Sequence, residues 1–266
     1  MNLCTIAPSS QLSMHIMQYW FLEMEAHEAV GERIVPTGYI ELTFHFAQTL
    51  IQRKHSDNLQ PSVIISGQKT GFFDVIPTGR TSMLSIQFYP HSASLFFDLP
   101  LSELTNETLN FNDLVGAPAR ELEEQLHALP TLNQKVAHIE QFLLLRLAHS
   151  AAYTWKRIAH NISIINQNNG NITPEQLASE ACLSRKQHER VFKQMVGLSP
   201  KQFLKIIRFQ YSIYAHQQFP NENLTELAYR CGFYDQSHMI NDFRELTGIT
   251  SKQYFNDCNN PISDYF

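Results

Sequence analysis

The chain has 266 residues, which is enough for two domains that each bury a hydrophobic core. Its apolar content of 43% is ordinary for a soluble globular protein, and no apolar run is long enough to cross a membrane. The N-terminus lacks the charged and then apolar layout of a secretion signal, so we expect a cytoplasmic protein. The four cysteines lie far apart without a CxxC pair, which predicts neither a disulfide framework nor a zinc site: Cys4, Cys182, Cys231 and Cys258. We expect no metal and no cofactor.

The net charge of −5 is distributed unevenly along the chain. Residues 1–150 carry 8 Lys and Arg against 15 Asp and Glu, a net charge of −7, whereas residues 151–266 carry 12 against 10, a net charge of +2. This difference predicts two domains, 1–150 and 151–266, with different partners. A net charge of +2 is nevertheless small for a domain that binds nucleic acid.

Strand signals dominate the first 90 residues. Four runs rich in β-branched and aromatic residues are bounded by turn residues: 14–25, 32–46, 61–67 and 71–90. Turns are expected at Thr37-Gly38 and Thr78-Gly79. A short helical piece at 91–100 and a loop over 101–116 should follow.

Helices are expected from Pro118 to Ser150, with a break at Pro130 that ends the first helix at or before Leu129. The second helix carries an apolar stripe on one face: Val136, Ile139, Leu143 and Leu147. This stripe could pack on the sheet, form a homodimer interface through residues 131–149, or do both. Packing within the domain is the default expectation.

A small curled sheet with aromatic side chains could enclose a ligand, although the same aromatics could form the core of the sheet: Phe44, Phe46, Phe72, Phe73 and Phe88. Glu41 and His45 lie four residues apart on one strand, which turns both to the face that carries Tyr39 and Thr43. Two titratable groups on one face could anchor a polar ligand or could face water. The candidate effector-binding residues are Tyr39, Glu41, His45 and Phe88.

Signals for the start and end of helices become clear after residue 170. Thr173 begins a capping box before a short helix over 174–180, and Ser184 caps a second helix that ends at Gly197. The second helix turns Val191, Phe192 and Met195 to a core and leaves polar residues on the other side: Arg185, Lys186, His188, Glu189 and Arg190. Two short helices with a tight turn and an exposed basic face indicate a helix-turn-helix, whose second helix enters the major groove of DNA.

The same arrangement recurs about fifty residues later. Asn223 begins a second capping box, Asp235 caps the helix that follows, and Gly248 ends it. Between the copies, a helix of about eighteen residues from Pro200 would span about 27 Å. Successive turns of one DNA groove lie about 34 Å apart, so this helix could hold two recognition helices over adjacent major-groove segments on one side of the duplex.

The segments LASEACLSRKQHERVFKQMVGLSPKQF and LTELAYRCGFYDQSHMINDFRELTGITSKQYF resemble the AraC/XylS-type transcription regulators over roughly residues 155–256. The run CGF-x-D-Q-S with its following F-R-x-x-x-G is close to diagnostic of that family. The resemblance implies a seven-helix domain with two helix-turn-helix motifs. The N-terminal half resembles the sensory domain of one uncharacterised branch of these regulators, which implies a regulatory role without naming an effector. The expected fold class is α+β, with a β-rich domain, helices, and then an all-α domain.

The resemblance also assigns residues. Seven positions on the two recognition helices would read bases: Lys186, Glu189, Arg190, Gln236, Ser237, His238 and Asn241. Six further residues are expected to contact phosphates: Ser184, Lys193, Lys201, Arg208, Arg244 and Lys252. The chain departs from the family where Cys182 replaces a frequent glycine, which either avoids a left-handed backbone or carries strain of about 1 kcal/mol. Ser251 replaces the usual proline after the second motif.

Together these features predict a sequence-specific transcriptional regulator that binds double-stranded DNA, could contact RNA polymerase, and has an N-terminal domain for a small-molecule effector or for dimerisation. Two alternatives stay open. The N-terminal domain could bind a partner protein, which an exposed apolar patch would favour over an enclosed pocket. It could also carry an enzymatic activity, but the sequence has no Gly-rich phosphate loop, HExxH or GxSxG, and only Cys4 lies in its first 150 residues.

Overall fold

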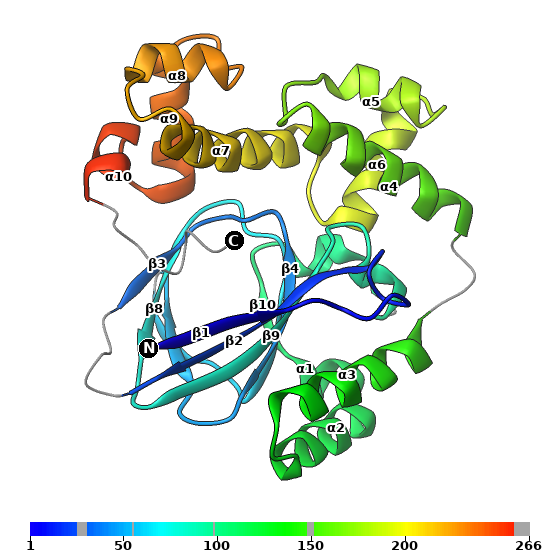
Figure 1. Cartoon of the computed structure of the whole chain (residues 1–266). Helices are drawn as coiled ribbons and strands as arrows, with labels where there is room; N and C mark the ends of the chain where they lie inside the picture. Colours follow the sequence, from blue (N-terminus) through cyan, green and yellow to red (C-terminus); the bar gives the residue numbers. More distant parts are fainter. Residues whose placement is uncertain (26–30, 55, 98, 148–151, 258–266) are drawn as a thin grey trace.

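The computed structural model describes residues 1–25, 31–54, 56–97, 99–147 and 152–257. A β-rich N-terminal domain with helices along one side is followed by an all-helical region that lies over one end of the strands (Figure 1). The expected α+β fold class is therefore confirmed. The expected domain boundary at 150/151 falls outside the described residues, as does Cys258. No described helix is both long and apolar enough to cross a membrane.

Two antiparallel sheets form the N-terminal domain. The larger sheet has the strand order β1-β2-β9-β4-β7-β10, and its strands are β1 (Asn2–Ile6), β2 (Ile16–Met24), β9 (Thr81–Phe88), β4 (Ile40–His45), β7 (Val63–Ser66) and β10 (Thr108–Asn110). The smaller sheet has the order β3-β8-β5-β6, and its strands are β3 (Glu32–Ile34), β8 (Phe73–Pro77), β5 (Leu50–Arg53) and β6 (Asp57–Leu59).

All four strand-like runs contain strands, and both expected turns are present. The turns at Thr37-Gly38 and Thr78-Gly79 are not hairpins, because each carries the chain from the smaller sheet to the larger one, from β3 to β4 and from β8 to β9. Strands β1, β5, β6 and β10 were not predicted. They are only three to five residues long, and β6 is exposed throughout, so they lack a clear apolar alternation.

The segment after β9 contains more regular structure than the sequence indicated. The short helical piece is confirmed as the 3₁₀ helix η2 (Ala93–Leu95). The region 101–116 was expected to be a loop, but it holds the 3₁₀ helix η3 (Leu101–Leu104), strand β10 and helix α1 (Phe111–Val115). These pieces are too short to produce a detectable period, which is why the pattern indicated a loop.

One face of the larger sheet packs against α1 and the two longer helices α2 (Ala117–Ala128) and α3 (Leu132–Arg146). The break at Pro130 is confirmed. Val136, Ile139 and Leu143 are at most 6% exposed and belong to this core, with Leu147 packed at its edge. The apolar stripe is therefore used inside the domain. Dimerisation through residues 131–149, of which the last two lie outside the described residues, stays a prediction.

Seven described helices form the C-terminal region: α4 (Ala152–Gln167), α5 (Pro174–Glu180), α6 (Arg185–Val196), α7 (Pro200–Gln218), α8 (Leu224–Arg230), α9 (Gln236–Thr247) and α10 (Ser251–Asp257). The boundaries expected for α5 and α6 are confirmed. Capping boxes begin four helices, at Thr173, Ser184, Ser199 and Asn223. Asp235 caps α9 by accepting a 2.7 Å hydrogen bond from the backbone of His238. Although Ser251 replaces the usual proline, α10 forms, and Thr250 bonds to Gln253 at its start.

The turns inside the two helix-turn-helix units have the same backbone conformation. Cys182 in the first unit has φ 52°, and Gly232 at the matching place in the second has φ 75°. In both turns the next residue donates to the helix before it, from Leu183 to Ala178 and from Phe233 to Ala228, each at 3.0 Å. Of the two outcomes considered for Cys182, the strained left-handed backbone is the one observed.

Replacing Cys182 with glycine should therefore stabilise the chain. A non-glycine residue in the left-handed region costs about 1 kcal/mol, so Cys182→Gly should raise the free energy of unfolding by roughly 0.5–1 kcal/mol. Urea unfolding followed by circular dichroism measures this change. Cys182→Ala is the control, because it removes the thiol and keeps the Cβ atom. Equal stabilisation by alanine would show that backbone strain is not the cause.

The helical region is docked on the N-terminal domain at several points. The hydroxyl of Thr105 donates to the backbone of Gly197 at the end of α6, and Arg33 donates to the backbone of Thr247 at the end of α9, at 3.1 Å. Val35, which precedes the turn before β4, is 6% exposed and lies in the core of the C-terminal helices. Gly38 follows it with φ 84°, and a Cβ atom there would lie 3.3 Å from Ile207 of α7.

Candidate functional site

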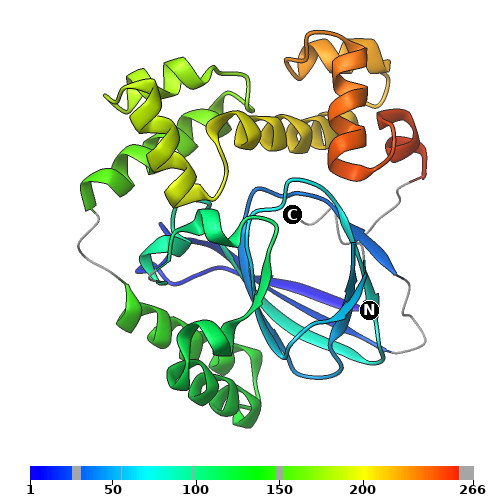
Figure 2. The same ribbon diagram turned by 180° about the vertical axis from the view of Figure 1, so that it is seen from behind.

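Helices α6 and α9 are the second helices of the two helix-turn-helix units, and their C-terminal ends rest on the N-terminal domain (Figure 2). A helix of 12 residues is about 18 Å long, so their N-terminal ends lie well away from that domain. The 19 residues of α7, about 28 Å of helix, separate the two units. The expected linker helix is thus present, and it carries one unit at each end.

The outer face of α6 is polar and charged. Lys186, Glu189 and Arg190 are all exposed, as expected for residues that meet a partner. His188 does not belong to this face, although its polarity suggested that it would: it is 1% exposed, and its Nε2 lies 2.7 Å from Oδ1 of Asn161. Position 188 is one helical turn before the buried Phe192, so both side chains point inward. Burial lowers the pKa of His188.

The outer face of α9 is only partly free. Ser237 and Asn241 are exposed. Gln236 is half-buried and accepts a 2.8 Å hydrogen bond from the hydroxyl of Thr225 on α8. His238 is also half-buried, with its ring edge-on to Phe233 at 5.5 Å. These two side chains are therefore partly oriented by the protein itself.

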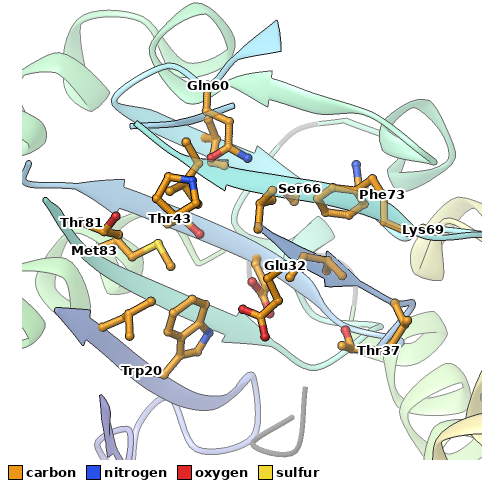
Figure 3. Close-up of a pocket in the computed structure, with 18 of the residues that line it drawn as sticks. Trp20, Glu32, Thr37, Thr43, Gln60, Ser66, Lys69, Phe73, Thr81 and Met83 are labelled. Carbon is orange, nitrogen blue, oxygen red and sulfur yellow. The ribbon is translucent and has the colours of Figure 1, made fainter. Parts of the chain in front are cut away.

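A cavity of about 440 Å³ lies in the N-terminal domain, between its two sheets (Figure 3). Apolar side chains dominate its wall, and Figure 3 places Trp20 and Met83 of the larger sheet and Phe73 of the smaller sheet around it. A volume of this size is within the range of sites that enclose a small organic molecule.

Strand β4 supplies the polar part of the cavity wall by simple alternation. Tyr39, just before the strand, lines the cavity together with Glu41, Thr43 and His45, which confirms that the four side chains share one face. Phe88 does not line it. Ile40 is paired with Phe88 in the register between β4 and β9, so Phe88 points with Ile40 into the core against the helices, where its ring is 5.4 Å from Phe96.

The carboxyl group of Glu41 is enclosed by neutral hydrogen-bond donors. Gln87 Nε2 donates to its Oε1 at 3.0 Å, and Ser85 Oγ donates to its Oε2 at 3.4 Å. Burial raises the pKa of Glu41, against hydrogen bonds from Gln87, Ser85 and Trp20 that lower it. The carboxyl group is thus held in a defined position inside the cavity wall.

Two polar groups at the other end of β4 have unused hydrogen-bonding capacity. His45 is 3% exposed, and neither of its ring nitrogens has a partner in the part of the chain that the structure describes. Gln60 is 8% exposed, and its Oε1 atom is likewise without a partner among the described residues. Burial lowers the pKa of His45 to about 4, against a smaller, opposing hydrogen-bond interaction with the neighbouring Gln60 that is too weak to count as a formed bond, so this imidazole is neutral at pH 7.

Lys69 contributes a cationic side chain to the cavity wall, but its ammonium group is already occupied. Nζ donates to the backbone of Glu107 and to the hydroxyl of Thr108, both at 2.8 Å, and it lies 5.4 Å from the ring centre of Phe73. Burial lowers the pKa of Lys69 to about 8. No group of three His, Cys, Asp or Glu residues suited to a metal ion occurs among the described residues.

The linker helix α7 contributes one residue to the cavity wall. Gln210 lines the cavity, and its Nε2 donates to the backbone oxygen of Pro36 at 2.6 Å. The helix that holds the two helix-turn-helix units apart therefore also borders the cavity of the other domain. Nothing in the local sequence around Gln210 indicated this role, because the contact joins residues 174 positions apart.

Two protein families match the chain. Residues 4–110 match a family described as "Domain of unknown function (DUF6597)", and residues 177–257 match the family described as "Helix-turn-helix domain". The second match covers both recognition helices. Residues 177–257 therefore form a helix-turn-helix domain, and residues 4–110 form a DUF6597 domain.

Named relatives match part of the chain. It is 34% identical over 83 residues to the uncharacterized HTH-type transcriptional regulator YdeC of Bacillus subtilis, which covers 31% of this chain and 28% of that protein. It is 33% identical over 70 residues to the HTH-type transcriptional activator RhaS of Klebsiella pneumoniae, which covers 26% of this chain and 25% of that protein. The chain thus matches between 25% and 28% of the length of these relatives.

Solved structures resemble the chain at low identity. ToxT from Vibrio cholerae superposes with a TM-score of 0.47 and 12% identity, covering 89% of this chain and 97% of that one. The DNA-binding domain of AdpA, solved in complex with a target DNA, superposes with a TM-score of 0.33 and 21% identity, covering 39% of this chain and 97% of that one.

Of the six residues expected to contact phosphates, five are exposed on the C-terminal helical region: Ser184, Lys193, Lys201, Arg244 and Lys252. Arg208 differs. Its side chain is 18% exposed, lies over the ring of Phe233, and approaches the carboxylate of Asp242 to 3.7 Å. It is an internal partner at the crossing of α7 and α9, where Lys205 also lies 3.5 Å from Asp242.

The pKa shifts of two buried histidines make the stability of the chain depend on pH. Burial lowers the pKa of His45 and of His91 to about 4, whereas an exposed histidine titrates near 6.5. Between these values the unfolded chain binds more protons than the folded chain, so the free energy of unfolding should fall as the pH drops from 6.5 to 4. Each histidine could contribute as much as about 3 kcal/mol.

Urea unfolding at pH 7.5 and pH 5.0 tests this expectation. His45→Gln and His91→Gln should each show a smaller loss of stability at pH 5.0 than the unmodified chain, and His160→Gln, at an exposed position, should not. The raised pKa of Glu41 acts in the opposite direction, so the comparison between variants isolates the histidines. An identical loss in all variants would contradict the assignment.

Proposed function

We propose that this chain is a sequence-specific transcriptional regulator in which α6 and α9 read adjacent segments of the major groove, and in which the cavity of the N-terminal domain binds a small-molecule effector. The observation that carries the proposal is the placement of two helix-turn-helix units at the ends of one helix, with both recognition helices directed away from the N-terminal domain.

The separation and chemistry of the two recognition helices support the DNA-binding part. About 28 Å of helix in α7 is comparable with the 34 Å between successive turns of one groove. On α6, Lys186 and Arg190 can donate to guanine, and Glu189 can accept from cytosine. On α9, Gln236 and Asn241 are suited to adenine, with Ser237 and His238 beside them. The five exposed phosphate candidates surround these faces and would set the position of the protein on the duplex.

The composition of the cavity supports a small molecule over a partner protein. It is largely apolar and carries a few polar groups, which is the composition of ligand sites, whereas a protein partner would need an exposed apolar patch. Tyr39, Glu41 and His45 remain the effector-binding candidates, and Phe88 is withdrawn. Gln210 offers a direct route from the cavity to α7, and hence to the spacing of the recognition helices.

Selection of bound DNA from a random pool tests the reading of two segments. We expect the unmodified chain to enrich a site with two parts about one helical turn apart. Arg190→Ala should relax the preference in one part and Gln236→Ala in the other, each by about 1–3 kcal/mol of discrimination. Arg120→Ala, which removes an exposed cation on α2, is the matched control. If both variants relaxed the same part, the two helices would not read separate segments.

A cavity-filling variant tests the effector part. A small molecule that binds the full chain should raise its Tm, because a ligand at about 100 times its Kd adds roughly 2.7 kcal/mol to the stability of the folded state. In Met83→Trp the larger side chain occupies the cavity, and the Tm shift should disappear. Leu109→Trp, at an exposed position on β10, should keep it. A compound that altered DNA binding equally in Met83→Trp would place the effector site elsewhere.

A further inference from the structure

The cavity wall carries charged groups of both signs. Two carboxyl groups line it, Glu41 from the larger sheet and Glu32 from the smaller sheet, together with the ammonium group of Lys69 and the N-terminal residue Met1. Figure 3 places Glu32 in the wall on one side of the cavity and Lys69 on another. Lys69 directs its hydrogen bonds to β10 and the residue before it, at the edge of the larger sheet. The ammonium group of Lys69 is therefore already engaged by the protein itself.

Glu41 lacks a cationic partner. Its hydrogen-bond donors, Gln87, Ser85 and Trp20, are all neutral, and no ion pair joins Glu41 to a basic residue in the part of the chain that the structure describes. An ionised carboxylate can accept about four hydrogen bonds, so capacity remains for a further donor from inside the cavity. A buried charge without a counter-ion is costly, and a cationic ligand would remove that cost by forming the missing pair.

We infer that the cavity binds an organic cation, an alkyl or arylalkyl amine, whose ammonium group pairs with Glu41 and whose apolar body fills the space between the two sheets. The inference rests on the effector role proposed above and names its ligand class. The apolar wall fits the body of such a molecule, and the aromatic faces of Trp20 and Phe73 attract cations. The raised pKa of Glu41 agrees with a carboxyl group that would gain from a cation nearby.

Polar side chains at the other end of the cavity indicate a second functional group on the ligand. His45 and Gln60 both line it and have unpartnered polar atoms, and both are more than nine-tenths buried. Four residues along a strand span about 13 Å, which sets the separation of His45 from Glu41 along β4. His45 is neutral and does not repel a cation. The best-fitting ligand therefore has an amine at one end and a neutral hydrogen-bonding group, such as a hydroxyl, at the other.

The position of Glu41 places the ammonium group at the end of the cavity nearest to α7. Glu41 is the second residue of β4, close behind the turn at Gly38 that packs on α7. Thr37 and Gln210 line the same cavity. A cation held by Glu41 would thus sit beside the contact between Gln210 and Pro36, whereas the other end of the ligand would lie among His45 and Gln60.

Isothermal titration of the full chain at pH 7.5 tests the ligand class with probes that differ only in the head group. The probes are decylamine, decanol and decanoate, and 4-phenylbutylamine with its alcohol and carboxylate counterparts. We expect the amine of at least one series to bind at least ten-fold more tightly than its alcohol and its carboxylate. In Glu41→Gln the amine should lose at least ten-fold in affinity, while the alcohol changes by less than two-fold. Glu121→Gln, at an exposed carboxylate on α2, is the matched control.

Tryptophan fluorescence locates the binding. The chain has two tryptophans, and Trp155→Phe leaves Trp20 in the cavity wall as the only one. The indole nitrogen of Trp155 has no hydrogen-bond partner among the described residues, so phenylalanine is a mild replacement. Trp20 emission should change on addition of the amine. For the far end, 10-amino-1-decanol should bind more tightly than decylamine, and His45→Phe should remove that difference.

The possible outcomes separate this inference from the proposed function. Three results would overturn the inference: the carboxylates bind best and Lys69→Met abolishes their binding, the three head groups bind equally, or no amine binds. The ranking of the head groups in the unmodified chain decides this even if Glu41→Gln fails to fold. If an amine binds through Glu41 but leaves DNA affinity unchanged, the inferred ligand class is supported and the proposed effector role is rejected. If another class of compound controls DNA binding through the cavity, the effector role is supported and the inference that the ligand is a cation is rejected.

Discussion

Strand β4 is hydrogen-bonded on both sides, to β9 and to β7, and its side chains alternate between two different environments. Ile40, Leu42 and Phe44 point to the helices and complete the main core of the N-terminal domain. Glu41 and His45 point the other way and become part of the cavity wall. A shift of one residue in the pairing would bury the charged side chains in the core and open the apolar ones to the cavity. The register of this one strand therefore maintains both the stability of the domain and the chemistry of its interior.

Helix α7 connects that interior to the DNA-binding face. Its two ends carry the helix-turn-helix units. Between them Gln210 donates to the backbone of Pro36 at the cavity wall, and the adjacent Val35 packs in the core of the C-terminal helices. At its crossing with α9, Lys205 and Arg208 surround the buried carboxylate of Asp242. A small rotation of α7 would disturb all of these contacts together. A movement of α7 caused by a change in the cavity would therefore also change the orientation of α9.

Features that depend on a few neighbouring residues could be predicted from the sequence. Thr173, Ser184 and Gly197 mark the helix ends through local hydrogen bonds and backbone preferences, so α5 and α6 were placed correctly. The shared face of Glu41 and His45 follows from the two-residue period of a strand. The left-handed conformation of Cys182 was considered because related sequences often have glycine at this position, and the backbone angle decided between the two outcomes.

The errors share a different cause, which is dependence on residues far along the chain. Phe88 was wrongly assigned to the cavity. The face to which it points is set by its pairing with Ile40, 48 positions earlier, which the local sequence does not reveal. His188 was wrongly assigned to the outer face because its polarity favoured exposure to solvent. The hydrogen-bond partner that allows its burial, Asn161, lies in another helix and could not be identified from the local sequence. The role of Gln210 could not have been expected at all. Its docking partner, the loop at 35–38, also has a consequence for the evolution of such proteins: because Val35 is built into the core of the helical region, exchange of N-terminal domains by recombination would succeed only when this loop and the matching face of α7 are inherited together.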